Sequence, residues 1–491
     1  MMDQGKKAMV GCTVAIPVDL LDREALAALR MRLSLKKRQS RRFVFGSAKS
    51  AAPDSVEFFQ MGEGCIHVPR KFGIAYAMER GIELDDRRSA GTPLRAKFDE
   101  AQQLVRPDLK PRQDKIVAEV VDGLLATPHN SGILRAGTGA GKTVMAVKAI
   151  CEVGRRALIV VHNESLLDQW RWHLTGFPNG RPGFTDLKEA DIGYIWQGKH
   201  DVSDKKIVLC MIQTLVRREF SPKERKAFGM VVFDEAHHLP ADVFSRAMLK
   251  FDAKFLLGLS ATPDRFDGLD VLLAYGLGET LNREVMGPQL LPEVFVIRHP
   301  TKIAKGMYMV YSYGGPNAGQ YKPSLARLVN AIVNVEGRND YLVALAVRSV
   351  RKGRKTMVFS DRLIHLERMK AAFDTIVNGS HTSAMFVGGL SKVARESAKQ
   401  ADILWCTYRY ASEGIDLPDR DCLILGTPKT YVRQVVGRIL RSIDGKKSPI
   451  VLDILDIGVP ELESMCASRA REYKAMSAVV HVPILSQEGP S

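Results

Sequence analysis

The fold of this chain is decided by SGILRAGTGAGKTVMAVKAI, residues 131–150. A short apolar run ends at Arg135, a glycine-rich turn follows at Gly137–Thr143, and an apolar helical segment begins directly after it. Glycines let the backbone wrap closely around a phosphate, and successive N–H groups and the helix N-terminus supply positive potential there. The order of strand, glycine-rich turn and helix therefore predicts a nucleotide-phosphate site in an α/β domain.

Two side chains at the end of this turn are predicted to carry chemistry. Lys142 can reach the β- and γ-phosphates of ATP, and the Thr143 hydroxyl is placed to ligate Mg²⁺. The pattern departs from G-x-x-x-x-G-K-[ST] because its first position is alanine, and the alternative is a fortuitous glycine-rich turn. The residues that we expect to bind ATP are Ala136, Gly137, Thr138, Gly139, Ala140, Gly141, Lys142 and Thr143.

A second constellation, VVFDEAHH at 231–238, places two carboxylates directly after an apolar strand. Asp234 is predicted to hold Mg²⁺, and Glu235 to orient and deprotonate an attacking water. Taken alone, an Asp-Glu pair after a strand is more often a helix N-cap. The adjacent His237 and His238 point to different sides, and no second ligand pair is spaced nearby, so a zinc site is not expected. The turn and the acid pair together favour a nucleotide hydrolase.

Short runs rich in Val, Ile and Leu, each followed by a turn and a helical stretch, recur from about residue 130. Such runs are typical of parallel strands buried on both faces. A loop-rich stretch at 281–319 separates two groups of them and predicts a linker with loops. We therefore expect two tandem parallel-sheet domains, at 101–285 and 286–491. The runs lie at 131–136, 156–161, 206–211, 229–235 and 255–263, and then at 356–361, 401–407, 421–426 and 449–454.

Residues 1–100 differ from the rest and predict a smaller accessory α+β domain. They contain a predicted strand at Thr13–Pro17, an amphipathic helix that begins near Asp22, and the basic run RMRLSLKKRQSRR at 30–42. A charge run is usually a solvated face, so this one is either that or a nucleic-acid-binding surface. Its basic residues are Arg30, Arg32, Lys36, Lys37, Arg38, Arg41 and Arg42.

Composition narrows the class of partner and the compartment. Lys and Arg number 71 against 55 Asp and Glu, a formal net charge of +16, which favours a polyanionic partner. No apolar run reaches the roughly 18–20 residues of a membrane span, and Pro17 and Asp19 come too early for a secretory signal. Seven cysteines without C-x-x-C spacing predict free thiols. We expect an intracellular, cytoplasmic protein whose partner is nucleic acid rather than a membrane.

The order of the motifs resembles that of superfamily 2 helicases of the DEAH type. The tetrad at 234–237 is similar to motif II, LSATP at 259–263 to motif III, and QVVGRILR at 434–441 to motif VI. The blocks similar to the remaining motifs are LKPRQ at 109–113, VVHNESLLDQW at 160–170, IQTL at 212–215, FSDR at 359–362 and ASEGIDLP at 411–418. Together these blocks span about residues 109–441, most of the chain.

The resemblance implies a role for one set of residues after another. Gln113 would read the adenine edge, Gly414 and Asp416 would also bind the nucleotide, and Gln434, Arg438 and Arg441 would act on its phosphates. Arg438 and Arg441 are three apart on a predicted helix and would share one face. Coupling between the nucleotide and motion is implied for His237, Ser260 and Thr262. Nucleic-acid contacts are implied for His162, Asn163, Gln213, Thr214, Ser360, Arg362 and Thr407.

Within the superfamily, the combination of motifs is most similar to the XPB-related and UvsW-type DNA helicases of phages and viruses. This implies two RecA-like sheets and a monomeric, ATP- and Mg²⁺-dependent motor that remodels forked or branched DNA in replication, recombination or repair. A restriction-system motor and an RNA helicase stay open as alternatives. A binding protein whose ATP site has decayed is disfavoured, because Lys142, Asp234, Glu235 and Arg438 are all present.

Overall fold

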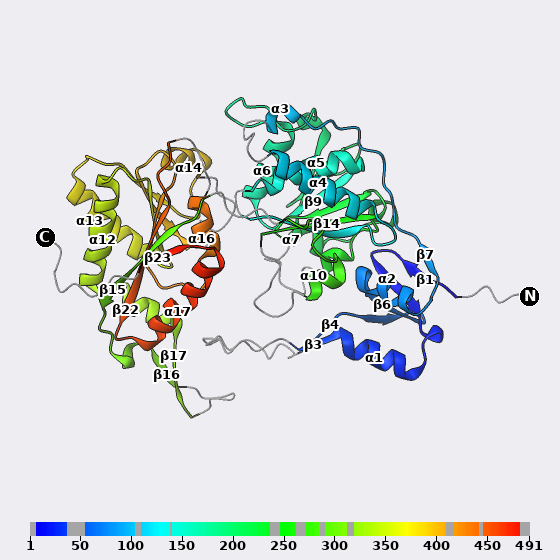
Figure 1. Ribbon diagram of the computed structural model, residues 1–491, viewed down its shortest axis with the longest axis horizontal. Coiled ribbons are helices and arrows are strands. Elements are labelled where there is room, and N and C mark those ends of the chain that lie inside the picture. Colours follow the sequence, from blue (N-terminus) through cyan, green and yellow to red (C-terminus); the bar gives the residue numbers. More distant parts are fainter. Residues whose placement is uncertain are drawn as a thin grey trace, which may run out of the picture. The chain divides into compact units, whose positions relative to one another are not determined.

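The computed structural model describes residues 6–36, 55–103, 110–137, 140–235, 246–261, 271–284, 290–311, 319–408, 417–440 and 445–481. These residues form two compact units, of which the first ends at residue 284 and the second begins at residue 290. Each unit is built around its own seven-stranded sheet, and the first also contains a smaller N-terminal sheet (Figure 1). The predicted fold class, tandem parallel-sheet α/β domains with a smaller α+β domain in front, is confirmed.

The sheet of the first α/β domain has the strand order β11-β10-β12-β9-β13-β14-β8. All strands except the edge strand β11 run parallel. They are β8 (Ser131–Arg135), β9 (Ala157–Val161), β10 (Ile192–Trp196), β11 (Lys199–Asp201), β12 (Ile207–Met211), β13 (Met230–Phe233) and β14 (Phe255–Ser260). The five strands predicted from the apolar runs of this domain are all present.

Helices cover both faces of this sheet, which is why its central strands consist almost wholly of buried apolar residues. One face packs against α4 (Lys110–Leu125), α5 (Lys142–Val153) and α6 (Glu164–Thr175). The other packs against α7 (Ile212–Arg217) and α10 (Val271–Gly276), as Figure 1 shows. Two short helices, α3 (Glu100–Gln103) and α8 (Pro222–Arg225), complete the described helices of this domain.

The N-terminal domain is a five-stranded sheet of order β5-β6-β2-β1-β7. Its strands are β1 (Ala8–Val10), β2 (Thr13–Pro17), β5 (Gln60–Gly62), β6 (Cys65–Pro69) and β7 (Leu84–Asp86), and its helices are α1 (Arg23–Leu33) and α2 (Arg70–Glu79). The predicted strand at 13–17 and the helix after Asp22 are confirmed, and the Asp22 carboxylate accepts the Ala25 N–H at 2.6 Å as an N-cap. Leu272 and Tyr275 of α10 belong to the hydrophobic core of this sheet, so the two domains share a core.

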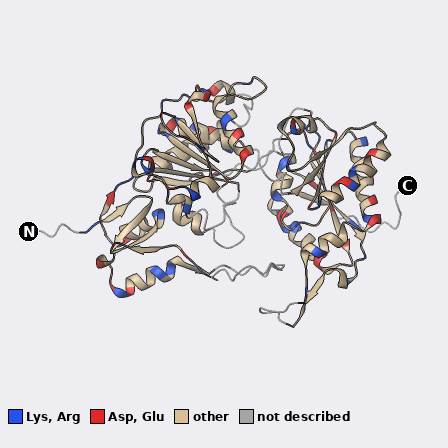
Figure 2. Cartoon of the chain, turned by 180° about the vertical axis from the view of Figure 1, so that it is seen from behind, with Lys and Arg blue, Asp and Glu red and all other residues tan. Residues whose placement is uncertain are grey.

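The basic run at 30–42 is described only in part. Arg30 and Arg32 lie on the exposed face of α1, and Lys36 ends β3 (Ser34–Lys36), which pairs with β4 (Ser55–Glu57). Figure 2 shows the positive residues along α1. The remaining members, Lys37, Arg38, Arg41 and Arg42, lie outside the described residues.

The second unit contains an all-parallel sheet of order β19-β20-β18-β21-β22-β15-β23. Its strands are β15 (Glu293–Pro300), β18 (Thr356–Ser360), β19 (Ser383–Phe386), β20 (Ile403–Thr407), β21 (Cys422–Leu425), β22 (Ile450–Ile457) and β23 (Val479–His481). The helices are α11 (Leu325–Ile332), α12 (Glu336–Arg351), α13 (Leu363–Val377), α14 (Lys392–Ala398), α16 (Arg433–Gly437) and α17 (Pro460–Ala475). A hairpin of β16 (Met309–Tyr311) and β17 (Tyr321–Pro323) lies before α11.

Two predictions about this unit need correction. The stretch 281–319 contains the eight-residue strand β15, which pairs with β22 along its whole length, so the prediction of linker and loops is wrong there. Only alternate residues of its first half are buried, and the strand therefore lacks a continuous apolar run. The helix expected to carry Arg438 ends at Gly437, a weak helix former, and Arg438 begins a short 3-10 turn instead.

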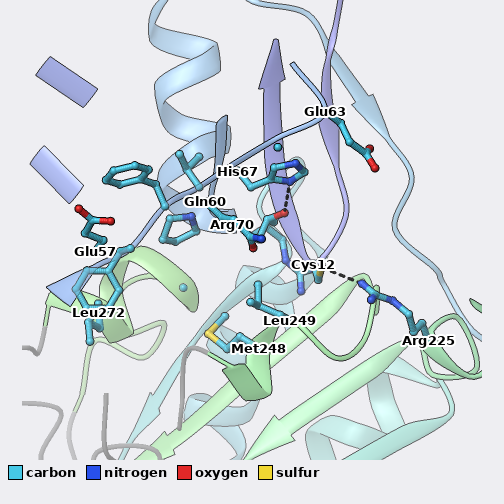
Figure 3. Close-up of a pocket in the computed structure, with 17 residues that line it drawn as sticks. Cys12, Glu57, Gln60, Glu63, His67, Arg70, Arg225, Met248, Leu249 and Leu272 are labelled. Atoms are coloured by element: carbon cyan, nitrogen blue, oxygen red, sulfur yellow. Dashed lines mark hydrogen bonds between the residues drawn. The ribbon is translucent and has the colours of Figure 1, made fainter. Parts of the chain in front are cut away.

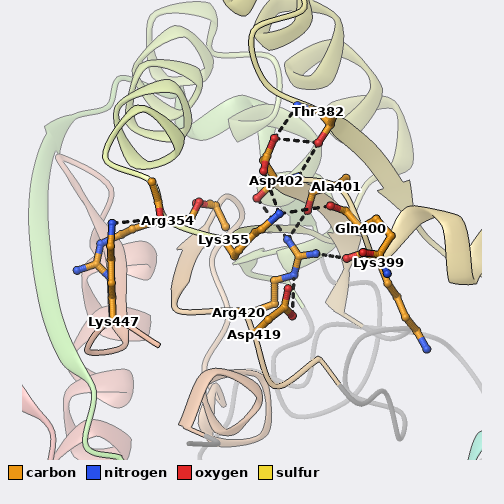
Figure 4. Close-up of polar contacts among 12 residues, drawn as sticks. Arg354, Lys355, Thr382, Lys399, Gln400, Ala401, Asp402, Asp419, Arg420 and Lys447 are labelled. Atoms are coloured by element: carbon orange, nitrogen blue, oxygen red, sulfur yellow. Dashed lines mark hydrogen bonds and ion pairs between the residues drawn. The ribbon is translucent and has the colours of Figure 1, made fainter. Parts of the chain in front are cut away.

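Buried arginines hold the second unit together. The Arg338 guanidinium lies 2.6 Å and 3.1 Å from the two carboxylate oxygens of Asp456 and donates to the Gly426 carbonyl at 2.6 Å. Arg469 pairs in the same way with Asp453. Arg420 has no exposed surface and donates to the carbonyls of Lys399, Ala401 and Asp402, which follow α14 (Figure 4). A cation at the C-terminal end of a helix satisfies carbonyls that would otherwise lack donors.

Candidate nucleotide-binding site

The glycine-rich turn after β8 ends in a left-handed glycine. Ala136 N–H donates to the Ser260 carbonyl at 3.1 Å, which ties the start of the loop to β14, and Ala140 N–H donates to the Gly137 carbonyl at 3.2 Å. Gly141 has φ of +85° and forms the N-cap of α5. Any residue other than glycine would be strained at this φ. Because Gly141 is the N-cap, the N-terminal N–H groups of α5 follow the loop directly.

Lys142 lies next to one member of the acid pair. Its Nζ donates to the Ala136 carbonyl at 3.2 Å and stands 3.8 Å from Glu235 Oε1. The two residues are far apart in the sequence but follow β8 and β13 of one sheet, whose carboxyl ends share an edge. The tertiary fold thus brings the predicted phosphate-binding lysine and the predicted water-activating glutamate together.

Asp234 is a buried carboxylate with an indole as hydrogen-bond donor. Only 5% of the residue is exposed, and Trp170 Nε1 donates to Asp234 Oδ2 at 2.8 Å. Burial, together with the negative charge of Glu235, raises the pKa of Asp234 to about 6, against the opposing effects of the Trp170 hydrogen bond and the charge of Lys142. Near neutral pH the group is a carboxylate that gains from binding a further cation.

Glu235 adopts a backbone conformation that side chains rarely accept. Its φ is +49°, in the left-handed region, although the residue is not glycine. Such strain persists only where the surrounding structure imposes it, and it concentrates at functional sites. The turn after β13 directs Glu235 toward Lys142, since their polar atoms approach within 4 Å.

Gln113, predicted to read the adenine edge, lies against the loop. It is buried on α4, and its Nε2 donates to the Ala140 carbonyl at 3.0 Å. A Cβ on Gly141 would stand 2.4 Å from the same Nε2, so this glycine is also required by the close approach of Gln113. Ion pairs of Lys148 with Glu100 of α3 and Asp114 of α4, at 2.7 and 2.8 Å, anchor these two helices to α5. Contact with adenine itself stays a prediction.

The donors near the loop suit Mg²⁺. The Asp234 carboxylate and the Thr143 hydroxyl are hard oxygen ligands, and Mg²⁺ in phosphate sites takes one or two such protein ligands, the rest coming from phosphate and water. Thr143 is half-buried as the second residue of α5. Within the described part of the chain, three or more His, Cys, Asp or Glu residues nowhere cluster as a metal site. A site completed by phosphate oxygens is consistent with both observations.

Four predicted nucleic-acid contacts of the first unit follow the neighbouring strands β9 and β12. Gln213 Nε2 donates to the His162 carbonyl at 3.0 Å, and Asn163 Nδ2 lies 3.1 Å from His162 Nε2. Asn163 also forms the N-cap of α6 by accepting the Leu166 N–H at 2.9 Å. Thr214 follows on α7. The structure therefore gathers this group at one edge of the sheet.

The predicted residues of the second unit differ in how deeply they are buried and in their hydrogen-bond partners. Ser360 is fully buried, accepts the Arg362 N–H at 3.1 Å and lies 3.0 Å from the His365 ring. The Arg362 guanidinium is half-buried and donates to Asn330 at 2.7 Å. Thr407 ends β20 and is half-buried, as are Gln434 on α16 and Arg438 in the following turn. The predicted residues Thr138, Gly139, His237, Thr262, Gly414, Asp416 and Arg441 lie outside the described residues.

Sequence reasoning missed Trp170. The segment VVHNESLLDQW carries the implied nucleic-acid contacts His162 and Asn163, and no functional role was predicted for its tryptophan. Trp170 is fully buried, and its indole N–H is the donor to Asp234. A buried tryptophan needs an acceptor for this N–H, and that requirement was the available signal.

A phosphate loop beside an acid pair, at the carboxyl edge of a parallel sheet, defines a nucleoside-triphosphate-hydrolysing site. The family model described as "Type III restriction enzyme, res subunit" matches residues 106–265, which contain this site. The putative ATP-dependent RNA helicase L396 of Acanthamoeba polyphaga mimivirus is 28% identical over 369 residues, 74% of this chain and 67% of that protein. The probable helicase D10 of Escherichia phage T5 is 25% identical over 332 residues, 66% of this chain and 67% of that protein.

Two solved structures are also similar. The Type ISP restriction-modification enzyme LlaBIII bound to DNA has a TM-score of 0.50 and 15% identity, over 75% of this chain and 31% of that one. T4 UvsW has a TM-score of 0.35 and 16% identity, over 97% of this chain and 99% of that one. The likeness to LlaBIII concerns the fold. The chain is an ATP-hydrolysing enzyme related in sequence to helicases of viral and phage type.

None of the helices within the described ranges is both long enough and apolar enough to cross a bilayer.

Proposed function

We propose that this chain is a superfamily 2 motor of the DEAH type, which couples ATP hydrolysis to movement along DNA. The observation that carries the proposal is the approach of Lys142 Nζ to Glu235 Oε1, 3.8 Å, beside the buried Asp234. The group formed by His162, Asn163 and Gln213 follows strands of the same sheet. A nucleic-acid motor requires a nucleotide site and, on the same sheet, polar groups that can contact the nucleic-acid backbone.

The proposed chemistry assigns one role to each of these groups. Lys142 holds the β- and γ-phosphates, and Glu235 orients the attacking water and accepts its proton. Asp234 and Thr143 hold Mg²⁺, which when bound neutralises charge on the phosphates. Gln434, Arg438 and Arg441 act from the second unit on the charge that develops during phosphoryl transfer. Hydrolysis then depends on closure of the two units, which links chemistry to motion.

Nucleic acid is gripped through its backbone rather than its bases. The grip uses His162, Asn163, Gln213 and Thr214 in the first unit and Ser360, Arg362 and Thr407 in the second, with coupling through His237, Ser260 and Thr262. The net charge of +16 supports a polyanionic partner. The domains are 1–100, an accessory nucleic-acid-binding domain, 101–285, which binds ATP, and 286–491, the second motor domain. The motor is monomeric and cytoplasmic.

The preferred substrate is forked or branched DNA, processed in replication, recombination or repair. The resemblance of the motifs to XPB-related and UvsW-type helicases of phages and viruses supports this choice. Two observations favour alternatives. The matches to the restriction-enzyme family model and to LlaBIII favour a restriction-system motor. The name of the mimivirus relative favours an RNA substrate.

The deciding experiment measures ATP hydrolysis and strand separation on a panel of substrates. Forked DNA, four-way junctions, simple tailed duplexes and RNA hybrids are compared at matched ionic strength. Preferential unwinding of forks and junctions supports the proposal. Translocation on linear duplex without unwinding supports the restriction-type motor, and preference for the hybrids supports the RNA helicase. Hydrolysis that no polynucleotide stimulates rules out the motor.

A further inference from the structure

A cavity of about 480 Å³ lies where the N-terminal sheet meets the first α/β domain (Figure 3). The N-terminal domain contributes Thr13, Gln60 and His67 to its lining, and the α/β domain contributes Met248 and Leu272. A volume of this size is typical of small-molecule sites. None of the predicted phosphate-loop or acid-pair residues belongs to its lining, so this cavity is distinct from the nucleotide-hydrolysing site.

One wall of the cavity contains a buried and incompletely paired arginine. Arg70 is the first residue of α2 and is 1% exposed. Its Nη1 donates to the carbonyls of Ala253 and Lys254, at 2.6 and 3.3 Å. Its Nε and Nη2 are buried and have no hydrogen-bond partner among the described residues. Burial lowers the pKa of Arg70 to about 9, and the positive charge of Arg88 acts in the same direction, so the group is still a cation at neutral pH.

Other buried arginines show what a purely structural role looks like in this chain. Arg338 and Arg469 each pair with a buried aspartate, and Arg420 donates to three carbonyls (Figure 4). Arg420 Nε also lacks a hydrogen-bond partner among the described residues, but it lies 3.5 Å from the Asp419 carboxylate. Arg70 differs, because it has no carboxylate partner and two of its nitrogens lack an acceptor among the described residues. Buried donors without acceptors are costly, and most of all when they carry charge. The two remaining nitrogens of Arg70 are therefore suited to an acceptor that enters the cavity.

The remaining lining defines the kind of acceptor. Phe58, Val68, Met248, Leu249 and Leu272 form an apolar part, and Thr13, Gln60 and His67 a polar part. Two glutamates also line the cavity, Glu57 and Glu63, and both are exposed, whereas Arg225 is held 3.6 Å from Asp252. Arg70 is thus the buried charge of this lining. An anion with a flat apolar body fits such a mixture better than a bare inorganic ion does.

The basic helix α1 adjoins the cavity. The Arg30 guanidinium stands 5.4 Å from the centre of the Phe59 ring, and Phe59 is a lining residue. Arg30 is exposed, and α1 presents it together with Arg32 (Figure 2). Cations along a surface attract a phosphate backbone and hold it near their own helix. A strand bound along α1 would therefore bring nucleotides to this cavity.

We infer that the cavity binds one nucleotide, with its phosphate on Nε and Nη2 of Arg70 and its base against the apolar wall that includes Phe58. A guanidinium edge with two parallel N–H groups matches the oxygens of a phosphate. The nucleotide can be free or part of a single strand. That the nucleotide belongs to a nucleic-acid strand rests on the proposed function of the chain. That the cavity binds a nucleotide does not depend on that function.

The test measures binding to the full chain carrying Lys142→Ala, so that the phosphate loop does not compete for the probes. The probes are dAMP and a single-stranded DNA of about ten nucleotides, a length typical of such sites. Arg70→Met is expected to weaken dAMP binding by about tenfold or more and DNA binding by about threefold, since one charge-assisted contact is lost. Arg225→Met is the matched control, because this second lining arginine already has an acidic neighbour, and it is expected to change neither affinity by more than about twofold.

Folding of each variant is checked by thermal unfolding. If Arg70→Met does not fold, Gln60→Trp replaces it, because residue 60 is exposed on β5 and a large ring there fills the cavity without altering Arg70. Weaker binding of both probes supports a site for a nucleotide of a strand, and weaker binding of dAMP alone supports a site for a free nucleotide. Unchanged affinity of a folded variant for both probes overturns the inference. Failure of the proposed motor function would appear separately, as ATP hydrolysis of the unaltered chain that no nucleic acid stimulates.

Discussion

Each parallel sheet of this chain carries a lysine beside a carboxylate at the carboxyl ends of its strands, and the two pairs differ. In the first unit Lys142 follows β8 and stands 3.8 Å from Glu235, which follows β13. In the second unit Lys429 follows β21 and pairs with Asp361, which follows β18, at 3.1 Å. The lysine of the first pair is the more buried of the two: 11% of the Lys142 side chain is exposed, against 40% of the Lys429 side chain.

The buried aspartates of the two sheets differ in the same sense. Asp453 and Asp456 in β22 are each matched by a buried arginine with short contacts. Asp234 receives one indole hydrogen bond, and burial and Glu235 raise its pKa to about 6. Two sheets of similar architecture thus treat charge in opposite ways. In the second sheet both acids of β22 are neutralised by buried arginines, whereas the first sheet leaves an acid that a ligand cation can still stabilise.

The largest expected effect comes from breaking the lysine–glutamate pair of the first sheet. Lys142→Ala removes the cation for the γ-phosphate, and Glu235→Gln removes the base that accepts the proton of water. We expect each to lower kcat for ATP hydrolysis by about 10²–10⁴-fold. Steady-state phosphate release with saturating nucleic acid measures this. Retention of more than about a tenth of the activity in both variants would contradict the assigned roles.

Breaking a buried arginine–aspartate pair of the second sheet is expected to lower the stability of that unit instead. Arg338→Met leaves Asp456 buried without its guanidinium, although the Thr301 hydroxyl still donates to it at 2.7 Å. The expected cost is about 3–5 kcal/mol in the free energy of unfolding of the second unit. Urea unfolding followed by tryptophan fluorescence and circular dichroism measures it. Lys370→Met is the control, because 42% of the side chain of its partner Asp374 on the same helix is exposed, and it should cost less than about 1 kcal/mol.

A third prediction concerns the acid limb of the pH profile. Because the pKa of Asp234 is raised to about 6, Mg²⁺ affinity in the presence of ATP should fall as the pH drops below 6, where the carboxyl takes up its proton. Trp170→Phe removes a hydrogen bond that stabilises the carboxylate, so the pKa rises further and the limb moves to higher pH. Mg²⁺ titration of ATP hydrolysis from pH 5 to 8 measures the shift. If the acid side of the pH profile stays where it is or moves to lower pH in this variant, the hydrogen bond of Trp170 does not stabilise the Asp234 carboxylate.

The smallest expected effect is that of the partly exposed pair in the second sheet. Lys429→Ala removes a pair whose lysine side chain is 40% exposed, and pairs open to solvent contribute about 0–1 kcal/mol. We expect a change in stability within that range and a change in ATP hydrolysis below about twofold. The same assays as for Lys142→Ala measure both. A loss of activity as large as that of Lys142→Ala would make the two sheets alike and remove the contrast between them.

Much of the fold was predictable because its signals are local. Every apolar run that predicted a strand is a strand in the structure, since parallel strands buried on both faces need unbroken hydrophobic residues. Asp22 was found as a helix start for the same kind of reason, because a cap acts on the next few N–H groups. The strand β15 was missed because its first half alternates in burial and its partner β22 lies far along the chain. Non-local pairing leaves no pattern in a short window of sequence.

The amino-acid sequence by itself determined the α/β class, and it predicted the phosphate loop and the residues to which the chemistry is assigned. Spacing, glycine at a left-handed position and paired acids after a strand are enough for that, because each acts within a few residues. Only the tertiary structure decided that Glu235 lies beside Lys142, that Trp170 donates to Asp234 and that Arg70 lines a cavity with two nitrogens to spare. Contacts between distant segments depend on how strands are ordered in a sheet and how domains pack, and that information is spread over the whole chain.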